Sequence, residues 1–292
     1  MISIGDRVGG RYHITNKIAH GGMADVYEAY DQVNRRIVAV KVMHEKMANN
    51  PQNIARFERE CVATSSLYNP NIVAVYDHGV VDGRPYMVNE YVKGQTLREK
   101  LNFSASGTLA VSEACNVIRQ LCSVVSYIHK HGLVHRDIKP ENLFYSADGT
   151  VKISDFGIST SIGEKQKGDS VSGTVNYSAP EILMGKPSTI AADIYSIGIL
   201  FFEILVGRVP FAGDTPEEVA VKQIRERIPL PSAERNDIPQ SFDRIIIKAT
   251  RKRPEERYHS ADDLLKDLEK AIEQEGGIRE KKGLFARIFG FK

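Results

Sequence analysis

The residue types best suited to chemistry gather between positions 135 and 157, where carboxylates, a carboxamide, cations and a glycine follow one another closely. The segment reads His135-Arg136-Asp137-Ile138-Lys139-Pro140-Glu141-Asn142 and, further on, Asp155-Phe156-Gly157. Two short apolar runs on either side of Asp148-Gly149 predict a β-hairpin. Pairing of these runs brings Asn142 and Asp155 to the open end of the hairpin, where two oxygen donors suit a hard cation such as Mg²⁺. Asp137 precedes Asn142 by five residues, near enough to serve as a base beside that cation.

The composition is typical of a soluble globular protein, with 42% hydrophobic and 26% charged residues in a chain of 292. This length is enough for two lobes with separate cores. No apolar run reaches the about 18 residues that a membrane-spanning helix needs, and the first residues lack the regions of a signal peptide. Three cysteines without metal-like spacing predict free thiols in a reducing cytosol, so we expect a cytoplasmic protein. They are Cys61, Cys115 and Cys122.

The positive charge is concentrated at the C-terminal end. Residues 276–292 carry five Lys or Arg against one Glu, a net charge of +4, which leaves −2 for the rest because the whole chain carries +2. We therefore expect no nucleic-acid-binding face in the body of the protein. Apolar residues interleaved with these cations predict a short amphipathic helix on an anionic membrane. A disordered tail, a partner-docking peptide and a juxtamembrane segment fit the same residues, Leu284, Phe285, Ile288, Phe289 and Phe291.

The apolar patterns predict a strand-rich first part followed by a helical second part. Alternation over 37–42 and a short run at 86–88 predict strands, and Pro51 is expected to open a helix with one buried face. Beyond a connector at 92–94, helical spacing recurs over 114–128, 191–206, 242–250 and 261–272. Gly132 and Gly207 are expected to end the first two of these helices. The Ser-, Gly- and Lys-rich segment 159–174 is expected to be a mobile loop.

These residues, in this order, resemble the protein serine/threonine kinase family, and in particular its bacterial eukaryotic-like members. The resemblance covers about residues 11–272 and includes Gly21-Gly22-Met23-Ala24, Val38-Ala39-Val40-Lys41 and the 135–157 segment. It implies an α+β, bilobal protein-kinase-like fold, with a small antiparallel β-sheet lobe carrying one key helix and a larger, mainly helical lobe. We expect the lobes at 1–91 and 92–275, with an activation segment at 155–181 and the basic tail at 276–292.

The resemblance also implies roles for individual residues. Lys41 matches the lysine that pairs with the α- and β-phosphates of ATP. Glu60 matches the helix glutamate that fixes this lysine, with Glu58 as its rival. Asp137 matches the aspartate that accepts or orients the substrate hydroxyl proton, and Lys139 matches the lysine that steadies the γ-phosphate.

Cofactor contacts follow from the same resemblance. Asn142 and Asp155 match the ligands of Mg²⁺, with Mn²⁺ as an alternative. Nucleotide contacts beyond Lys41 are implied for Ile18, Gly21, Gly22, Val26, Ala39, Glu90, Val92 and Leu143.

Other matches indicate a protein as the substrate. Ala179-Pro180-Glu181 resembles the end of an activation segment, and Arg257 resembles the arginine that pairs with its glutamate. Asp193, a charge within a buried helix, must find partners and resembles the aspartate that holds the catalytic-loop backbone. Gly173-Thr174 resembles the loop that receives the substrate serine or threonine. Arg136 implies activation by a loop phosphate, for which the candidates are Ser159, Thr160, Ser161, Ser170 and Ser172.

The chain departs from the family pattern at two places. Of the glycines in the family's Gly-x-Gly-x-x-Gly-x-Val, the segment Ala19–Val26 keeps only the middle one in register. Because a methyl group at Ala19 restricts the backbone φ, we expect weaker ATP binding or slower turnover. Asn89 precedes the expected hinge Glu90-Tyr91-Val92, where an apolar residue is usual, and its amide can bond to water or to nucleotide.

Zinc binding is not expected at the neighbouring histidines 129, 131 and 135. His129 and His131 fall at a helix end, and neither a cysteine nor a carboxylate completes a set of ligands. His135 resembles a buried structural histidine of the family.

The sequence therefore predicts a non-specific serine/threonine protein kinase that acts on protein substrates and on itself, with self-association for phosphorylation in trans. The competing interpretation is a pseudokinase scaffold, which only Ala19 favours. A small-molecule phosphotransferase is disfavoured by the activation segment.

Overall fold

The computed structural model describes residues 2–156 and 175–275. Several expectations lie outside these residues: Gly157, the loop serines and threonines, Gly173-Thr174 and the basic tail. The chain divides into two units, Met1–Gly94 with Lys152–Thr160, and Gln95–Val151 with Ser161–Lys292. The first unit thus takes in a segment that the sequence analysis placed in the second lobe. The lobe boundaries expected from the sequence remain a prediction.

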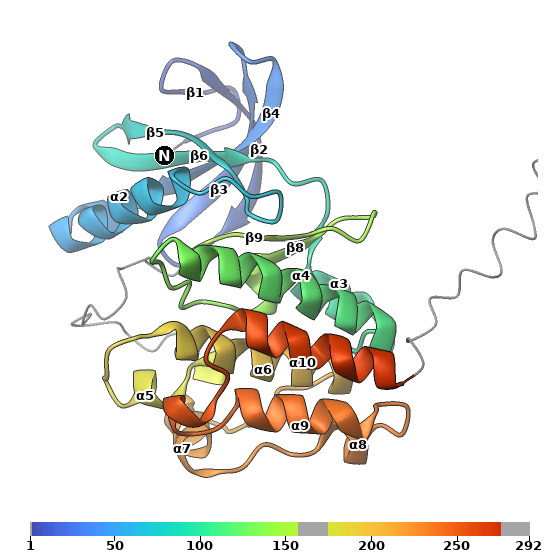
Figure 1. Ribbon diagram of the computed structural model, residues 1–292. Helices are drawn as coiled ribbons and strands as arrows, with labels where there is room; N and C mark the ends of the chain where they lie inside the picture. Colours follow the sequence, from blue (N-terminus) through green and yellow to red (C-terminus); the bar gives the residue numbers. More distant parts are fainter. Residues whose placement is uncertain (1, 157–174, 276–292) are drawn as a thin grey trace, which may run out of the picture. The chain divides into compact units, whose positions relative to one another are not determined.

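The first unit is built on one antiparallel sheet with the strand order β1-β2-β3-β4-β6-β5 (Figure 1). The strands expected at 37–42 and 86–88 are confirmed as β4 and β6. The six strands are β1 (Arg7–Val8), β2 (Tyr12–His20), β3 (Ala24–Asp31), β4 (Arg36–Met43), β5 (Val75–Val81) and β6 (Arg84–Glu90).

The two faces of this sheet bury different residues, because side chains alternate along each strand. Val38, Val40 and Val42 of β4 are at most 2% exposed and belong to the core on one face. Lys41 and Met43 alternate with them and therefore lie on the opposite face. The register thus decides that Lys41 shares a face with the residues that pack against a helix.

That helix is α2 (Pro51–Ser65), which follows the short α1 (Glu45–Ala48). Asn50 caps it by accepting a hydrogen bond from the backbone N–H of Gln52 at 2.9 Å, and Pro51 occupies the first turn, as expected. Phe57 and Cys61 are one turn apart and pack with the methionines of β4 and β6. This packing fixes the helix against the Lys41 face of the sheet.

The second unit is mainly helical (Figure 1). Its central helix, α6 (Ile190–Val206), is apolar almost all round and confirms the helix expected at 191–206. It packs against α4 (Val111–Lys130) and α9 (Gln240–Ala249). The helices expected at 114–128, 242–250 and 261–272 are confirmed as well. The elements are α3 (Leu97–Phe103), α4 (Val111–Lys130), α5 (Pro180–Leu183), α6 (Ile190–Val206), α7 (Pro216–Arg225), α8 (Pro231–Glu234), α9 (Gln240–Ala249) and α10 (Ala261–Gln274), with 3₁₀ turns η1 (Pro140–Asn142), η2 (Val175–Tyr177) and η3 (Pro254–Glu256).

Two glycines end helices as expected. Gly132 follows the C-cap of α4 with φ +76°, and Gly207 caps α6 with φ +88°. Both values lie in the left-handed region, where a side chain would cause strain. At Gly207 an added Cβ would also lie 2.6 Å from the carbonyl oxygen of Ser106.

The expected hairpin is present in a second sheet with the order β7-β8-β9, formed by β7 (Gln95–Thr96), β8 (Leu143–Tyr145) and β9 (Val151–Ile153). In its turn, Ser146 N–H donates to the carbonyl of Thr150 at 3.0 Å, and Gly149 adopts φ +83°. Within the first unit, Ile153 donates to the carbonyl of Asn71 at 2.8 Å and accepts from Val73 N–H at 2.9 Å. These bonds explain why the segment after β9 belongs to the first unit.

No helix in the described part of the chain is long and apolar enough to cross a membrane. The three cysteines are free and buried, as the sequence predicts.

Candidate active site

The first group of chemically capable residues, which we call the lysine cluster, consists of Lys41, Glu60 and Asp155 in the first unit. Lys41 Nζ lies 3.6 Å from Glu60 Oε1 and 2.7 Å from Asp155 Oδ1. The pairing with Glu60 agrees with the sequence analysis, whereas the rival Glu58 is exposed. Burial by itself would lower the pKa of Lys41, but the charges of Asp155 and Glu60 raise it above its ordinary value. The ammonium group is therefore held charged and in place.

Asp155 owes its position to its backbone. It follows β9 by two residues and adopts φ +49°, in the left-handed region that aspartate enters only at a cost. Its carboxylate is 48% exposed although it bonds to Lys41. An exposed anion on a fixed backbone is a suitable donor for a hard cation.

The second group, the Asp137 cluster, consists of Asp137, Lys139 and Asn142 in the second unit. Asp137 Oδ2 accepts from Asn142 Nδ2 at 2.8 Å and lies 2.7 Å from Lys139 Nζ. Asn142 Nδ2 also donates to the carbonyl of Asp137 at 2.8 Å. Asp137 Oδ1 is buried and has no hydrogen-bond partner among the described residues. The cluster thus orients one carboxylate oxygen through two neighbours and leaves the other available to accept a proton.

A buried carboxylate fixes the backbone just before this cluster. Asp193 of α6 is 0% exposed and accepts hydrogen bonds at 2.8 Å from the backbone N–H groups of His135 and Arg136 and from His129 Nε2. Although burial opposes ionisation, the bond from His129 and the neighbouring positive groups lower the pKa of Asp193. The partners expected for this charge are confirmed, and they hold Arg136 at φ +71°.

Hydrogen bonds position His129 and His131, and His135 is buried as its resemblance implied. His129 bonds to Asp193, His131 Nδ1 bonds to the carbonyl of Tyr127 at 2.8 Å, and His135 is fully buried. The carboxylate of Asp193 does lie beside His129, which the sequence did not suggest. The other hydrogen bonds of Asp193 come from the backbone N–H groups of His135 and Arg136.

The sequence analysis missed a second buried carboxylate in α6. Glu203 is 4% exposed and lies 2.8 Å from Arg98 of α3, and its other oxygen accepts from Tyr177 OH at 2.5 Å. Arg98 also bonds to Glu141 at 2.7 Å, directly before Asn142. The sequence does carry a signal for this network: Glu203 is a second acidic residue inside an apolar helix, and a buried charge needs a partner. The resulting network ties η1, α3, α6 and η2 together.

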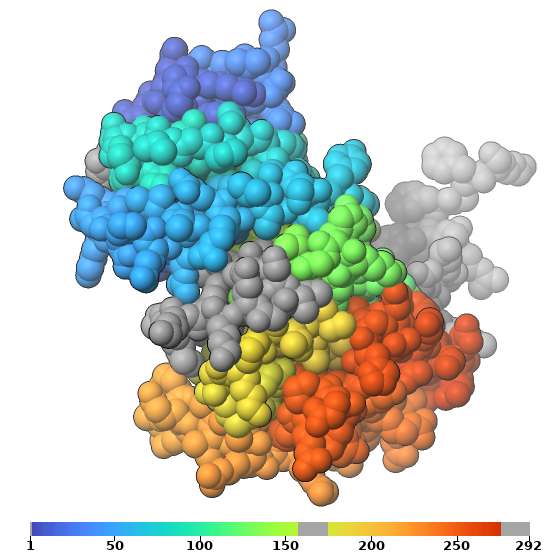
Figure 2. Space-filling model, turned by 60° about the vertical axis from the view of Figure 1, so that its left-hand side comes forward, coloured from blue at the N-terminus to red at the C-terminus, as the bar shows by residue number. Residues whose placement is uncertain are grey.

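The expected ion pair between Glu181 and Arg257 is confirmed. Two bonds of 2.7 Å join the guanidinium to the carboxylate, and the side chains are 0% and 5% exposed. Figure 2 shows the surfaces of the two chain segments that this pair connects, yellow around α5 and orange to red toward the C-terminal part. Glu181 is the last residue of the activation segment expected at 155–181. Its pairing with Arg257 therefore fixes the C-terminal end of that segment.

The glycine-rich segment forms the turn between β2 and β3. Gly21 N–H donates to the carbonyl of Ala24 at 3.0 Å, and neither Gly21 nor Gly22 has a positive φ. Ala19 lies in β2 opposite Val26 and also lacks a positive φ, so its methyl group causes no backbone strain in this structure. Ile18, 47% exposed, sits at an irregularity in the register of β2. The weaker ATP binding expected from Ala19 remains a prediction.

The strand register places further nucleotide candidates on the Lys41 face. Val26 pairs with Lys41, and Ala39, two residues away on β4, pairs with Asn89. Asn89 Oδ1 is a buried acceptor without a hydrogen-bond partner among the described residues. Glu90 ends β6, where its carboxylate pairs with Lys152 at 2.9 Å.

The two remaining nucleotide candidates belong to different units. Val92 follows β6 in the first unit, and Leu143 starts β8 in the second unit and is fully buried.

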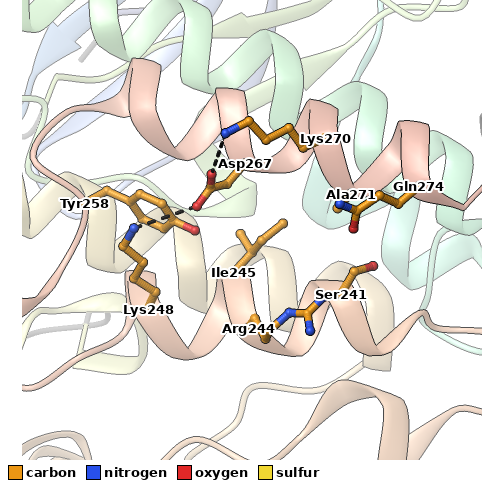
Figure 3. A pocket seen from close by; sticks show the side chains of 9 residues that line it. All are labelled: Ser241, Arg244, Ile245, Lys248, Tyr258, Asp267, Lys270, Ala271 and Gln274. Atoms are coloured by element: carbon orange, nitrogen blue, oxygen red, sulfur yellow. Dashed lines mark ion pairs between the residues drawn. The ribbon is translucent and has the colours of Figure 1, made fainter.

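A hollow of about 230 Å³ lies between α9 and α10 in the second unit. Figure 3 shows Asp267 held between Lys248 and Lys270, which lie 3.7 and 3.8 Å away. The hollow is smaller than most small-molecule sites, which measure about 300–1,000 Å³, and its acidic group is already paired. It contributes nothing to the chemistry of the two clusters.

Comparison with known proteins identifies the family. The model of the protein kinase domain family matches residues 12–268. This chain belongs to the protein kinase domain family. The kinase domain is 41% identical over 281 residues to the serine/threonine-protein kinase PrkC of Bacillus subtilis, covering 96% of this chain and 43% of that protein.

Two further relatives are bacterial. The kinase domain is 39% identical to the probable serine/threonine-protein kinase PknB of Lactococcus lactis, covering 92% of this chain and 43% of that protein. It is 37% identical to the serine/threonine-protein kinase PknB of Mycolicibacterium smegmatis, covering 88% and 42%. The chain therefore spans less than half the length of these relatives.

Solved structures confirm the fold. A crystal structure of the PknI kinase domain of Mycobacterium tuberculosis matches with a TM-score of 0.76 at 23% identity, covering 93% of this chain and 99% of that one. The kinase fold expected from the sequence, an antiparallel sheet unit and a helical unit, is thereby confirmed. Members of this family use ATP and a divalent metal ion on protein substrates.

Proposed function

We propose that this kinase domain transfers the γ-phosphoryl group of ATP to serine or threonine residues of proteins, itself included. The observation that carries the proposal is Lys41 held as a charged group between Glu60 and Asp155. An anchored ammonium group is prepared to neutralise phosphate oxygens, because no ordering remains to be done when the nucleotide binds.

The Asp137 cluster supplies the groups that act on the acceptor hydroxyl. Asp137 Oδ1, which has no hydrogen-bond partner within 2–156 and 175–275, accepts or orients the hydroxyl proton, while Oδ2 is held by Asn142 and Lys139. Lys139 also balances charge on the group being transferred. The Asp193 bonds keep the backbone of this cluster in one conformation.

The donor set fits Mg²⁺, with Mn²⁺ as the alternative. Asn142 donates through Nδ2, so its amide oxygen is the atom able to bind a cation, and Asp155 adds a carboxylate. Hard divalent cations prefer such oxygen ligands and supply positive charge beside the phosphates. Nucleotide contacts are proposed for Ile18, Gly21, Gly22, Val26, Ala39, Glu90, Val92 and Leu143.

Asn89 lies on the same face of the sheet as Ala39 and Lys41. Its buried Oδ1 has no hydrogen-bond partner in the described part of the chain. We propose that it accepts a hydrogen bond from water or nucleotide, so Asn89→Met should change ATP affinity more than the turnover number.

The pseudokinase alternative rested on Ala19 alone, and the backbone of Ala19 has no positive φ in this structure. The deciding experiment incubates the chain with γ-labelled ATP, Mg²⁺ and a basic acceptor protein. We expect incorporation into the acceptor and into the chain, and a fall of at least about 100-fold for Asp137→Asn. The exposed Asp214→Asn is the matched control. No incorporation by folded wild-type protein would favour the scaffold.

Two further parts of the proposal concern partners. Phosphorylation in trans requires transient self-association, so the initial rate of self-labelling should rise with the square of protein concentration. Peripheral membrane contact through 276–292 rests on the apolar and basic composition of that segment. Equal sedimentation with anionic liposomes in the presence and absence of those residues would remove the membrane proposal.

A further inference from the structure

The first unit contains a second cluster of ligand-type side chains, separate from the lysine cluster. His20, Asp25 and His44 each offer one atom, and these three atoms lie within 4.8 Å of one another. We call this group the histidine cluster. It combines two imidazole nitrogens with one carboxylate oxygen, a donor set that favours Zn²⁺ and related transition-metal ions.

The register of the sheet creates this cluster. His20 ends β2 and pairs directly with Asp25 of β3, so their side chains leave the same face. His44 follows β4, and its backbone N–H donates to the carbonyl of Met23 at 2.9 Å, which continues the β3–β4 ladder by one residue. The three groups therefore come from the ends of three adjacent strands, and their backbones are fixed by ladder hydrogen bonds.

One of the two distances to the carboxylate already suits a shared cation. Asp25 Oδ1 lies 3.3 Å from His44 Nε2, whereas it is hydrogen-bonded to His20 Nδ1 at 2.6 Å. In tetrahedral zinc sites the ligand atoms lie about 2.0–2.2 Å from the ion and hence about 3.3–3.5 Å from each other. The two imidazole rings are stacked with centroids 4.8 Å apart. To join the ion, His20 exchanges its direct hydrogen bond with Asp25 for a bond to the metal and moves outward by less than about 1 Å.

Two observations beyond proximity favour a ligand. His44 Nε2 is a buried nitrogen that makes no well-formed hydrogen bond in the described structure, despite its nearness to Asp25. Asp25 is held from behind by Tyr27 OH, which donates to its second oxygen at 3.3 Å. A metal-binding carboxylate commonly has such an outer hydrogen bond, because it orients the ligating oxygen.

The cluster is distinct from the groups assigned to nucleotide. Asp25 pairs with Val42, whereas Val26 pairs with Lys41, and alternation places these pairs on opposite faces of the sheet. A cation bound here does not lie on the Lys41 face, where ATP is proposed to bind.

We propose that His20, Asp25 and His44 form a binding site for a Zn²⁺-class divalent cation that joins the mouth of the β2–β3 hairpin to the end of β4. The bound ion restrains the turn Gly21–Met23, because His20 directly precedes the turn and Asp25 is the second residue after it. An effect of the bound ion on ATP binding, through this restrained turn, rests on the proposed kinase function. The binding of the cation itself does not.

Lys17 provides an internal competitor. Its Nζ lies 2.9 Å from the same Asp25 oxygen, and its side chain is 44% exposed and able to move away. The ammonium group and a metal ion cannot both occupy this oxygen at close range without repulsion. Removal of Lys17 should therefore strengthen metal binding, an effect that scattered surface histidines would not show.

The test uses the full chain without a polyhistidine tag, stripped of metal and titrated with Zn²⁺ against a chromophoric chelator in excess Mg²⁺. We expect one tight equivalent that Mg²⁺ does not displace, since Mg²⁺ prefers oxygen ligands alone. His44→Gln should weaken the affinity by at least about tenfold. The exposed His78→Gln is the matched control and should leave it unchanged. Lys17→Met should tighten it.

Two further measurements distinguish a loss of metal binding from misfolding of the variant. Co²⁺ should give the visible absorption bands of a low-coordinate site in wild type and lose them in His44→Gln. Zn²⁺ should raise the Tm of wild type but not of that variant, because a ligand stabilises only the state that it binds. Equal Zn²⁺ affinity in wild type and His44→Gln, or no gain in Lys17→Met, overturns the proposal.

Discussion

Lys41 Nζ lies 2.7 Å from Asp155 Oδ1, although 114 residues separate them in the sequence. The lysine therefore contacts a proposed metal ligand as well as its expected partner Glu60. Both carboxylates are thus paired with the same ammonium group.

Loss of the Lys41 charge should abolish phosphoryl transfer. We expect Lys41→Met to lower the rate of incorporation by at least about 100-fold, because fixed charges at the transferring group are worth that much. The exposed Lys46→Met should leave the rate unchanged. Radiolabel transfer at saturating ATP is the measurement, with circular dichroism to verify folding. Normal turnover by a folded Lys41→Met protein would contradict the role assigned to this residue.

The buried pair of Glu181 and Arg257 should matter for stability. Either Glu181→Gln or Arg257→Met should lower the free energy of unfolding by about 3–5 kcal/mol, because one charge stays buried without its partner. Chemical denaturation measures this. The exposed pair of Arg253 and Glu256, 3.9 Å apart, is the control, and Arg253→Ala should have little effect. Equal effects at the two sites would show that burial does not set the cost.

Lys252 should make stability depend on pH in the alkaline range. Burial, together with the charge of Arg257, lowers the pKa of Lys252 from 10.5 to about 8. Between these two values the unfolded chain holds the proton that the folded chain has released, so the free energy of unfolding should rise with pH. Below pH 8 both states are protonated and this contribution is constant.

The measurement for Lys252 is the difference in unfolding free energy between wild type and Lys252→Met from pH 7 to 10.5. We expect the unfolding free energy of wild type to increase relative to that of the variant as the pH rises above 8. The comparison of wild type with Lys46→Met should stay flat, because that lysine is exposed in the folded state as well. A flat difference for Lys252→Met would rule out the depressed pKa.

The cysteines should be unreactive in the native protein. Burial raises the pKa of Cys61 and of Cys115 to about 12, and that of Cys122 is raised as well. Thiolate is the reactive form, so a chromogenic disulfide reagent should label the native chain slowly and the denatured chain at three sites. Rapid labelling of one thiol under native conditions would indicate local opening around it.

The sequence by itself determined several of the elements and some of the pairs. Glycines 132 and 207 marked helix ends because only glycine enters the left-handed region without strain. Asp193 was predictable because a charge within an apolar helix must find a partner, whereas the pairing of Arg257 with Glu181 was implied by the resemblance to protein kinases. The resemblance to protein kinases supplied the pairing of Lys41 with Glu60.

Only the tertiary structure decided which distant groups converge. The histidine cluster depends on the register of three strands, and a shift of one residue would send its members to opposite faces. The network of Arg98 and Glu203 depends on how α3 packs in the second unit. Periodicity reports which face of an element is buried, but it carries no information on the partner across the contact. The sequence therefore determined where charges must be paired, and the fold decided with which partner.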